Sequence, residues 1–220
     1  MRDIGFDTGH FLAGTVLVIS FMLLYQDRIF GMLKIFALQA LALAAAVAWQ
    51  AHTQNAPHLF VTAWLAFVMK AMIIPWTLHR MVLKLGIQRD IEKVVGVGMT
   101  MLGGIGLTVL AVMVVFSVTE GAAGFTREDL AFALAVILLG LLTMITRRNA
   151  ISQIIGFMSL ENGLILAASG AKGMPLVVEI SVAFSVLIAF FVFGVFVFRI
   201  RERFDTVDVD TLDRFRGERE

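Results

Sequence analysis

The stretch VVGVGMTMLGGIGLTVLAVMVVFSV, residues Val94–Val118, contains no charged side chain. A helix needs about 20 mostly apolar residues to cross a hydrocarbon layer about 30 Å thick. Only a helix of this kind satisfies its own backbone hydrogen bonds where water is absent. Because the stretch meets the length requirement without a single charge, it predicts a transmembrane helix.

Six further apolar stretches of similar length flank this one, and short segments with charges and turn-forming residues separate them. They are Gly9–Tyr25, Ile29–Trp49, His58–Val82, Leu130–Thr146, Ala150–Ser169 and Met174–Phe198. The sequence therefore predicts an all-α, polytopic membrane protein with seven transmembrane helices. We divide it into a four-helix part over residues 1–125, a three-helix part over residues 126–199 and a tail over residues 200–220.

The composition supports the membrane prediction and excludes several functions. Of the 220 residues, 59% are hydrophobic and 16% are charged, against roughly 45–50% and 25% in soluble domains. The chain has no cysteine and only four histidines, so we expect no disulfide, no metal site and no cofactor in it. Its net charge is +1 and its basic residues are scattered, so nucleic acid is excluded as a partner and the lipid bilayer is expected.

Lysine and arginine are distributed unequally between alternate joints of the seven predicted helices. The joints on one side, together with the tail, carry thirteen such residues, and the joints on the other side carry three. Basic residues remain on the cytoplasmic side of a membrane. We therefore predict that the N-terminus lies outside and that the C-terminal tail is cytoplasmic.

A few ionisable residues fall inside or near the ends of the predicted helices: Lys34, Lys70, Glu161, Glu179 and His79. A charge at the bilayer centre costs about 2.5–3.5 kcal/mol, so such residues usually face the interior of a bundle. Two lysines and two glutamates carry no net charge, which permits pairing. We predict that these five residues form a proton relay, with Lys70 and Glu161 near the middle of the membrane.

Each of these residues also has a structural interpretation. Lys34 is close enough to a helix end to extend its ammonium group into the interface. Glu179 would be favoured near the start of its helix by the macrodipole. Lys70 can serve as an assembly salt bridge, and His79 as an ordinary interfacial histidine. Glu161 lies too deep for an interfacial role.

Two other patterns concern the helices themselves. Pro75 cannot donate a hydrogen bond to the carbonyl four residues before it, so it predicts a kink in the third helix. Gly96, Thr100, Gly104 and Thr108 recur every four residues. A stripe of small residues allows close approach of another helix, and we interpret this stripe as a packing surface.

The later part of the chain resembles a known family. The joint Arg147-Arg148-Asn149 and the block Gly156–Gly163, GFMSLENG, are similar to the K-type small subunit of respiratory complex I and its antiporter relatives. A longer resemblance covers nearly the whole chain and is to hydrogenase-four component E, the membrane subunit of formate hydrogenlyase-type complexes. It rests also on Lys70–Arg80, Met174–Glu179 and Phe198–Asp205.

This resemblance implies a non-redox subunit that is not an enzyme by itself. Its implied partners are antiporter-like and other membrane subunits and a cytoplasmic nickel–iron hydrogenase or related redox arm, in a bacterial or archaeal cytoplasmic (inner) membrane. It implies a proton-handling role for Glu161 and a similar role for Glu179. Ser185 stands where we expect an acidic residue in these relatives, so the chain departs from the family pattern at one expected proton-carrying position.

Several other functions are compatible with buried charges or with seven helices. A retinal pump is excluded because Gly173–Phe198 contains no lysine to form a Schiff base. A receptor is disfavoured by the short joints. The remaining alternatives are a subunit of a multisubunit sodium/proton antiporter and a purely structural scaffold subunit.

Overall fold

A computed structural model describes residues 2–85, 95–119 and 124–170, all within one unit, Met1–Ala183. The described residues form helices and no strand. The helices are α1 (Arg2–Tyr25), α2 (Ile29–Gln54), α3 (Pro57–Leu65), η1 (Ala66–Ile73), α4 (Ile74–Leu85), α5 (Val97–Val118), α6 (Gly124–Thr146) and α7 (Ala150–Gly170). Because α3, η1 and α4 follow one another without a break, they form one long span.

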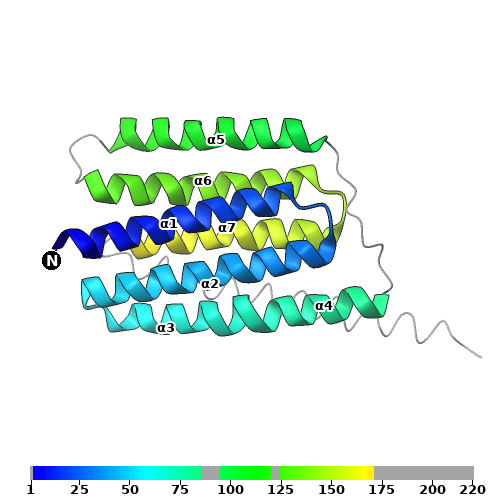
Figure 1. The fold of residues 1–220 in the computed structure, drawn as a ribbon, viewed down its shortest axis with the longest axis horizontal. Coiled ribbons are helices and arrows are strands. Elements are labelled where there is room, and N and C mark those ends of the chain that lie inside the picture. Colours follow the sequence, from blue (N-terminus) through cyan, green and yellow to red (C-terminus); the bar gives the residue numbers. More distant parts are fainter. Residues whose placement is uncertain (1, 86–94, 120–123, 171–220) are drawn as a thin grey trace, which may run out of the picture. The chain divides into compact units, whose positions relative to one another are not determined.

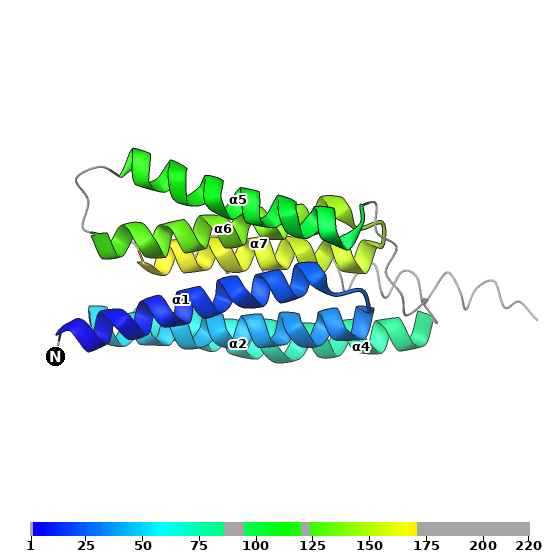
Figure 2. The same cartoon turned by 45° about the horizontal axis from the view of Figure 1, so that its top comes forward.

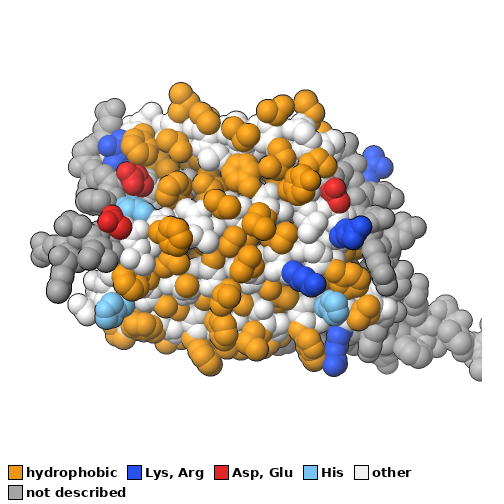
Figure 3. All heavy atoms as spheres, viewed as in Figure 1, with side chains coloured by type: hydrophobic (Ala, Val, Ile, Leu, Met, Phe, Trp, Pro, Cys, Tyr) orange, Lys and Arg blue, Asp and Glu red, His pale blue; other side chains and the backbone are white. Residues whose placement is uncertain are grey.

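Six helices in the described residues are long and apolar enough to cross a membrane. They are Asp7–Tyr25, Ile29–Gln54, Pro57–Leu83, Val97–Val118, Arg127–Thr146 and Ile151–Gly170. These spans correspond to the first six predicted from the sequence. The seventh predicted helix, Met174–Phe198, and the predicted tail lie outside the described residues. On the face shown in Figure 3, apolar side chains cover the middle of the molecule and charged side chains lie toward its two ends.

The helices pack as a layered bundle within the described unit. Figure 1 shows α1, α2, α6 and α7 in the middle, with α5 on one side and α3–η1–α4 on the other, and Figure 2 shows the same arrangement from another direction. The most extensive packing is between α6 and α7, and α5 packs mainly on α6. On the opposite side, α2 contacts α3, η1 and α4.

We name the two ends of the bundle after one residue at each. The Arg147 end is where α1 and α6 end and α2 and α7 begin, and the His10 end is the opposite one. At the Arg147 end α7 begins with a capping interaction, because Ile151 N–H donates to Asn149 Oδ1 at 2.9 Å. At the His10 end α2 stops at Asn55, whose left-handed φ of 51° ends the helix, and Pro57 starts α3.

Glycines allow α6 and α7 to pack with their backbones in contact. A Cβ atom at Gly140 would lie 2.7 Å from the Cα atom of Leu160, and one at Gly156 would lie 2.8 Å from the backbone nitrogen of Met144. No rotamer change relieves a clash with backbone atoms. The close approach of α7 to α6 therefore depends on the absence of side chains at these positions.

The residues of the predicted packing stripe on α5 differ in burial. Thr100 and Gly104 are buried, and Thr108 is partly buried. A Cβ atom at Gly104 would meet the side chains of Leu24, Leu139 and Phe21 within 3.1 Å. Gly96 is exposed at the start of the helix with open space around it. The contact with the bundle is therefore made by the middle of the stripe.

Immediately before Pro75, where a kink is predicted, the helix is π-helical over Ala66–Ile73. Proline has no N–H group and its ring crowds the carbonyl of the preceding turn, so a regular α-helix cannot continue across it. The wider π turn accommodates this, and π turns are rare segments that are frequently found at functional sites. Lys70 lies inside this segment.

Candidate buried charge site

The structure brings Lys70 and Glu161 together in the interior of the bundle. Lys70 Nζ lies 3.1 Å from Glu161 Oε2. The two residues are only 1% and 2% exposed, respectively. They come from η1 and α7 and are far apart in the sequence, so the contact depends on the packing of the helices.

The pair lies deep in the membrane-spanning part of the chain. Glu161 is eleven residues from the start of α7 at Ala150, which is about 16 Å along a helix. Lys70 is thirteen residues from the end of its span at Leu83, which is about 20 Å. Neither side chain reaches an interface from these positions, so each charge is compensated within the protein.

A chain of amide and hydroxyl groups extends from the pair toward α1. Lys70 Nζ donates to Asn162 Oδ1 at 2.9 Å, and Asn162 Nδ2 donates to Gln39 Oε1 at 3.2 Å. Gln39 Nε2 in turn donates to Ser20 Oγ at 2.7 Å and to Ser159 Oγ at 2.8 Å. All these side chains are buried. The site therefore joins α1, α2, η1 and α7 through polar groups at one level of the bundle.

Sequence reasoning based on charge did not identify Gln39, Asn162, Ser20 or Ser159. The available signal was the presence of an amide in an otherwise apolar span, most clearly Gln39 within ALQAL. An uncharged polar residue in a membrane helix usually has a hydrogen-bond partner on another helix. That rule would have selected Gln39 but would not have named its partners.

Gln39→Leu is expected to destabilise the protein by about 1–3 kcal/mol, because it leaves the buried Asn162 amide donor without its acceptor. The free energy of unfolding in detergent micelles measures this loss. Gln153→Leu is the control, because Gln153 is exposed and, among the described residues, its side chain bonds only to the carbonyl of Arg147. An equal loss in both variants would contradict a special contribution of the network.

Apolar side chains enclose this polar level on both sides along the helix axes. In α2 the buried residues Phe36 and Leu43 flank Gln39, and in α7 Ile155 and Ile165 flank Glu161. The residues toward the His10 end belong to an apolar core cluster of α1, α2, α3, α6 and α7. The described helices thus place buried apolar side chains on both sides of the charge pair.

Of the other predicted relay residues, Lys34 and His79 do not join the pair. Lys34 and His79 are exposed. Lys34 forms no hydrogen bond or ion pair with any residue of the described ranges, and His79 contacts the ring of Phe30 with the centroids 4.8 Å apart. Their inclusion in one relay rests on their ionisable side chains and their depth in the spans, and neither property specifies the helix face. Glu179 lies outside the described residues.

Two further polar contacts lie at the ends of the bundle. At the His10 end, His10 Nδ1 is 2.6 Å from Asp129 Oδ1 and links α1 to α6. At the other end, Arg147 Nη2 donates to the carbonyl of Leu24 at 2.6 Å, where a cation is favoured by the C-terminus of α1. Burial lowers the pKa of the Arg147 guanidinium to about 10, so it remains charged at neutral pH. Among the residues with described positions, no group of three or more His, Cys, Asp or Glu residues could hold a metal ion.

Comparison with known proteins gives the family of this chain. It is 31% identical to the "Uncharacterized protein Rv0085" of Mycobacterium tuberculosis over 208 residues, which is 94% of either chain. The chain belongs to the family of this mycobacterial protein. It is also 27% identical to the Hydrogenase-4 component E of Escherichia coli K12, over 94% of this chain and 96% of that protein. The Shigella flexneri protein of the same name matches to the same extent.

No protein-family profile matches the chain, and no solved structure matches it. The likeness to the hydrogenase component is a distant relationship that covers nearly the whole of both chains. Together with the six apolar helices, it indicates a multi-pass membrane protein related to a hydrogenase-4 subunit.

Proposed function

We propose that this chain is a non-redox membrane subunit of a hydrogenase-type, proton-coupled redox complex, and that its Lys70–Glu161 pair takes part in proton translocation or coupling. The observation that carries this proposal is an ion pair at 3.1 Å in the interior of membrane-spanning helices. The distant relationship to Hydrogenase-4 component E supports the redox complex as its setting. The proposed partners are other membrane subunits and a redox arm, in a bacterial or archaeal inner membrane.

The pair is suited to proton transfer because either of its two forms is electrically neutral. Lys70 and Glu161 can exist as ammonium and carboxylate. They can also exist as amine and carboxylic acid, after a proton transfers from Lys70 Nζ to Glu161 Oε2, which lie 3.1 Å apart. Neither form places a net charge in the hydrocarbon. A change of charge or position in a neighbouring subunit can therefore shift the proton between the two groups at moderate cost.

The amide groups around the pair hold it in place and do not carry protons. Asn162 and Gln39 are neutral amides whose hydrogen bonds run in one direction, away from Lys70. They fix the position of the ammonium group. Since buried apolar residues close the site along the helix axes, we propose that coupling runs along the membrane through neighbouring subunits.

Glu161→Gln tests this function, since it preserves side-chain size and removes the titratable group. In inverted membrane vesicles that contain the intact complex, we expect redox-driven proton uptake, followed by a pH-sensitive dye, to fall by at least about tenfold. Electron transfer to an artificial acceptor should persist, because the chain holds no redox centre in this proposal. Glu128→Gln is the control, because Glu128 is an exposed carboxylate at the His10 end.

The result also separates the alternatives. Unchanged proton uptake in the Glu161→Gln vesicles, with normal amounts of complex, would contradict the relay and favour a scaffold. Purification of the complex from native membranes in a mild detergent tests its composition. Recovery without a nickel–iron or iron–sulfur protein would instead favour a sodium/proton antiporter.

A further inference from the structure

Lys34 is exposed although it lies inside a membrane span. It is five residues from the start of α2 at Ile29, which is about 8 Å along the helix. A lysine at this depth extends its ammonium group toward the headgroup region while its methylene chain stays in apolar surroundings. We therefore expect the ammonium group at the level of the lipid phosphates.

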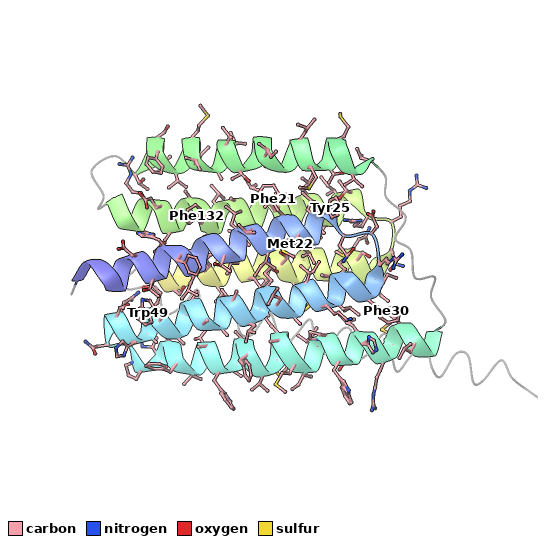
Figure 4. All side chains as sticks on the ribbon, in the orientation of Figure 1. Phe21, Met22, Tyr25, Phe30, Trp49 and Phe132 are labelled. Carbon is pink, nitrogen blue, oxygen red and sulfur yellow. The ribbon has the colours of Figure 1, made fainter. Side chains whose placement is uncertain are left out.

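A ring contact between α2 and α4 brings His79 beside the part of α2 that carries Lys34. The ring of Phe30 contacts the ring of His79, and Lys34 lies one helical turn from Phe30 on the same face of α2. Arg80, which follows His79 in the chain, is exposed, and its guanidinium lies 4.0 Å from the centre of the ring of Trp76. Figure 4 shows Phe30 at the Arg147 end of α2, beside α4, and Figure 3 shows basic and histidine side chains gathered at this end.

The helices that carry these basic groups offer no acid to neutralise them. No aspartate or glutamate occurs between Ile29 and Leu85. Lys70 is neutralised from α7 by Glu161, but Lys34 and Arg80 form no ion pair with any residue that the structure describes. Among the described residues, Lys34 and Arg80 therefore present exposed positive charges without an acidic partner.

Apolar side chains continue from this basic cluster toward the middle of the membrane. On α2, Leu38 and Leu41 are each 45% exposed, and they follow Lys34 on the same helix face at spacings of four and seven residues. On the neighbouring span, Met72 and Ile73 are exposed. This arrangement matches a phospholipid. Its phosphate would lie at the positive group, and its acyl chains would lie along the apolar strip.

We propose that Lys34, His79 and Arg80 form a binding site for the headgroup of an anionic phospholipid, whose acyl chains lie along α2 and η1. The site uses no residue of the buried charge pair and does not depend on the proposed function. An acidic segment of a protein partner would match the basic groups but not the apolar strip beyond them.

Native mass spectrometry of the full chain, freed of lipid in detergent, tests the site with added phosphatidylglycerol or phosphatidylcholine of identical acyl chains. We expect phosphatidylglycerol to bind at least about tenfold more tightly. Lys34→Gln and Arg80→Gln should each weaken its binding by about fivefold. Arg148→Gln is the control, because Arg148 is an exposed arginine at the same end but in the α6–α7 joint, and it should change the affinity less than about twofold.

The double variant Lys34→Gln/Arg80→Gln should fold, because both side chains are exposed, and gel filtration verifies this. Phosphatidylglycerol should raise the thermal midpoint of the natural protein and leave that of the double variant unchanged. Equal affinity for the two lipids would overturn the site, as would an equal loss in Arg148→Gln. Cross-linking of Lys34 to an acidic protein segment that excludes the lipid would likewise overturn it.

Discussion

Lys70→Met is expected to lower the free energy of unfolding by about 3–5 kcal/mol, because it leaves the carboxylate of Glu161 buried without its cation. Glu161→Met should cost a similar amount through the unpaired ammonium of Lys70. The double variant Lys70→Met/Glu161→Met should lie close to the natural protein, because replacing a whole buried pair by apolar side chains of similar size is often neutral or stabilising. Reversible unfolding in mixed micelles measures all three.

Lys34→Met is the control for this cycle, because it removes the same charge from an exposed position. In lipid-free micelles we expect a loss below about 1 kcal/mol. A double variant that loses as much as the sum of both single variants would show that the two groups are not coupled. In that case the ion pair would contribute nothing to stability, and its role in proton handling would lose its physical basis.

Among glycine-to-alanine substitutions in the described helices, we expect Gly140→Ala to lower the stability of the protein most. The added Cβ would lie 2.7 Å from the Cα atom of Leu160, so α6 and α7 must separate. We expect a loss of about 3 kcal/mol, at the upper end of the usual cost of overpacking. Because Leu160 precedes Glu161, the displacement should also weaken the charge pair.

Gly106→Ala provides a control of opposite sign. Gly106 lies on α5, and apart from the adjacent residues and backbone of its own helix no atom lies within 4 Å of an added Cβ. Alanine favours a helix over glycine by about 1 kcal/mol. This variant should therefore be neutral or more stable in the same thermal unfolding measurement. If the Gly140 and Gly106 variants behaved alike, the close backbone contact of α6 and α7 would be unsupported.

The sequence predicts that Lys70 and Glu161 belong to a buried site, but it does not predict which other side chains contact them. Lys70 and Glu161 stand out because a charge within an apolar span requires compensation. Lys34 satisfies the same criterion yet is exposed on another helix face. Depth along a helix is set by residue number, whereas the direction of a side chain relative to the bundle depends on which helices pack against it. The amides Gln39 and Asn162 carry no charge, so their presence in an apolar span is a weaker indication of a buried site.

The sequence by itself determined the membrane setting, the helical class and the positions of the six described spans. These features follow from local sequence, because each apolar stretch must be long enough to cross the lipid and forms its own backbone hydrogen bonds there. Only the tertiary structure decided that Lys70 meets Glu161, that Asn162 and Gln39 hold the pair, and that Lys34 lies outside it. These contacts join residues far apart in the chain, and they exist because glycines and small side chains allow particular helix faces to meet.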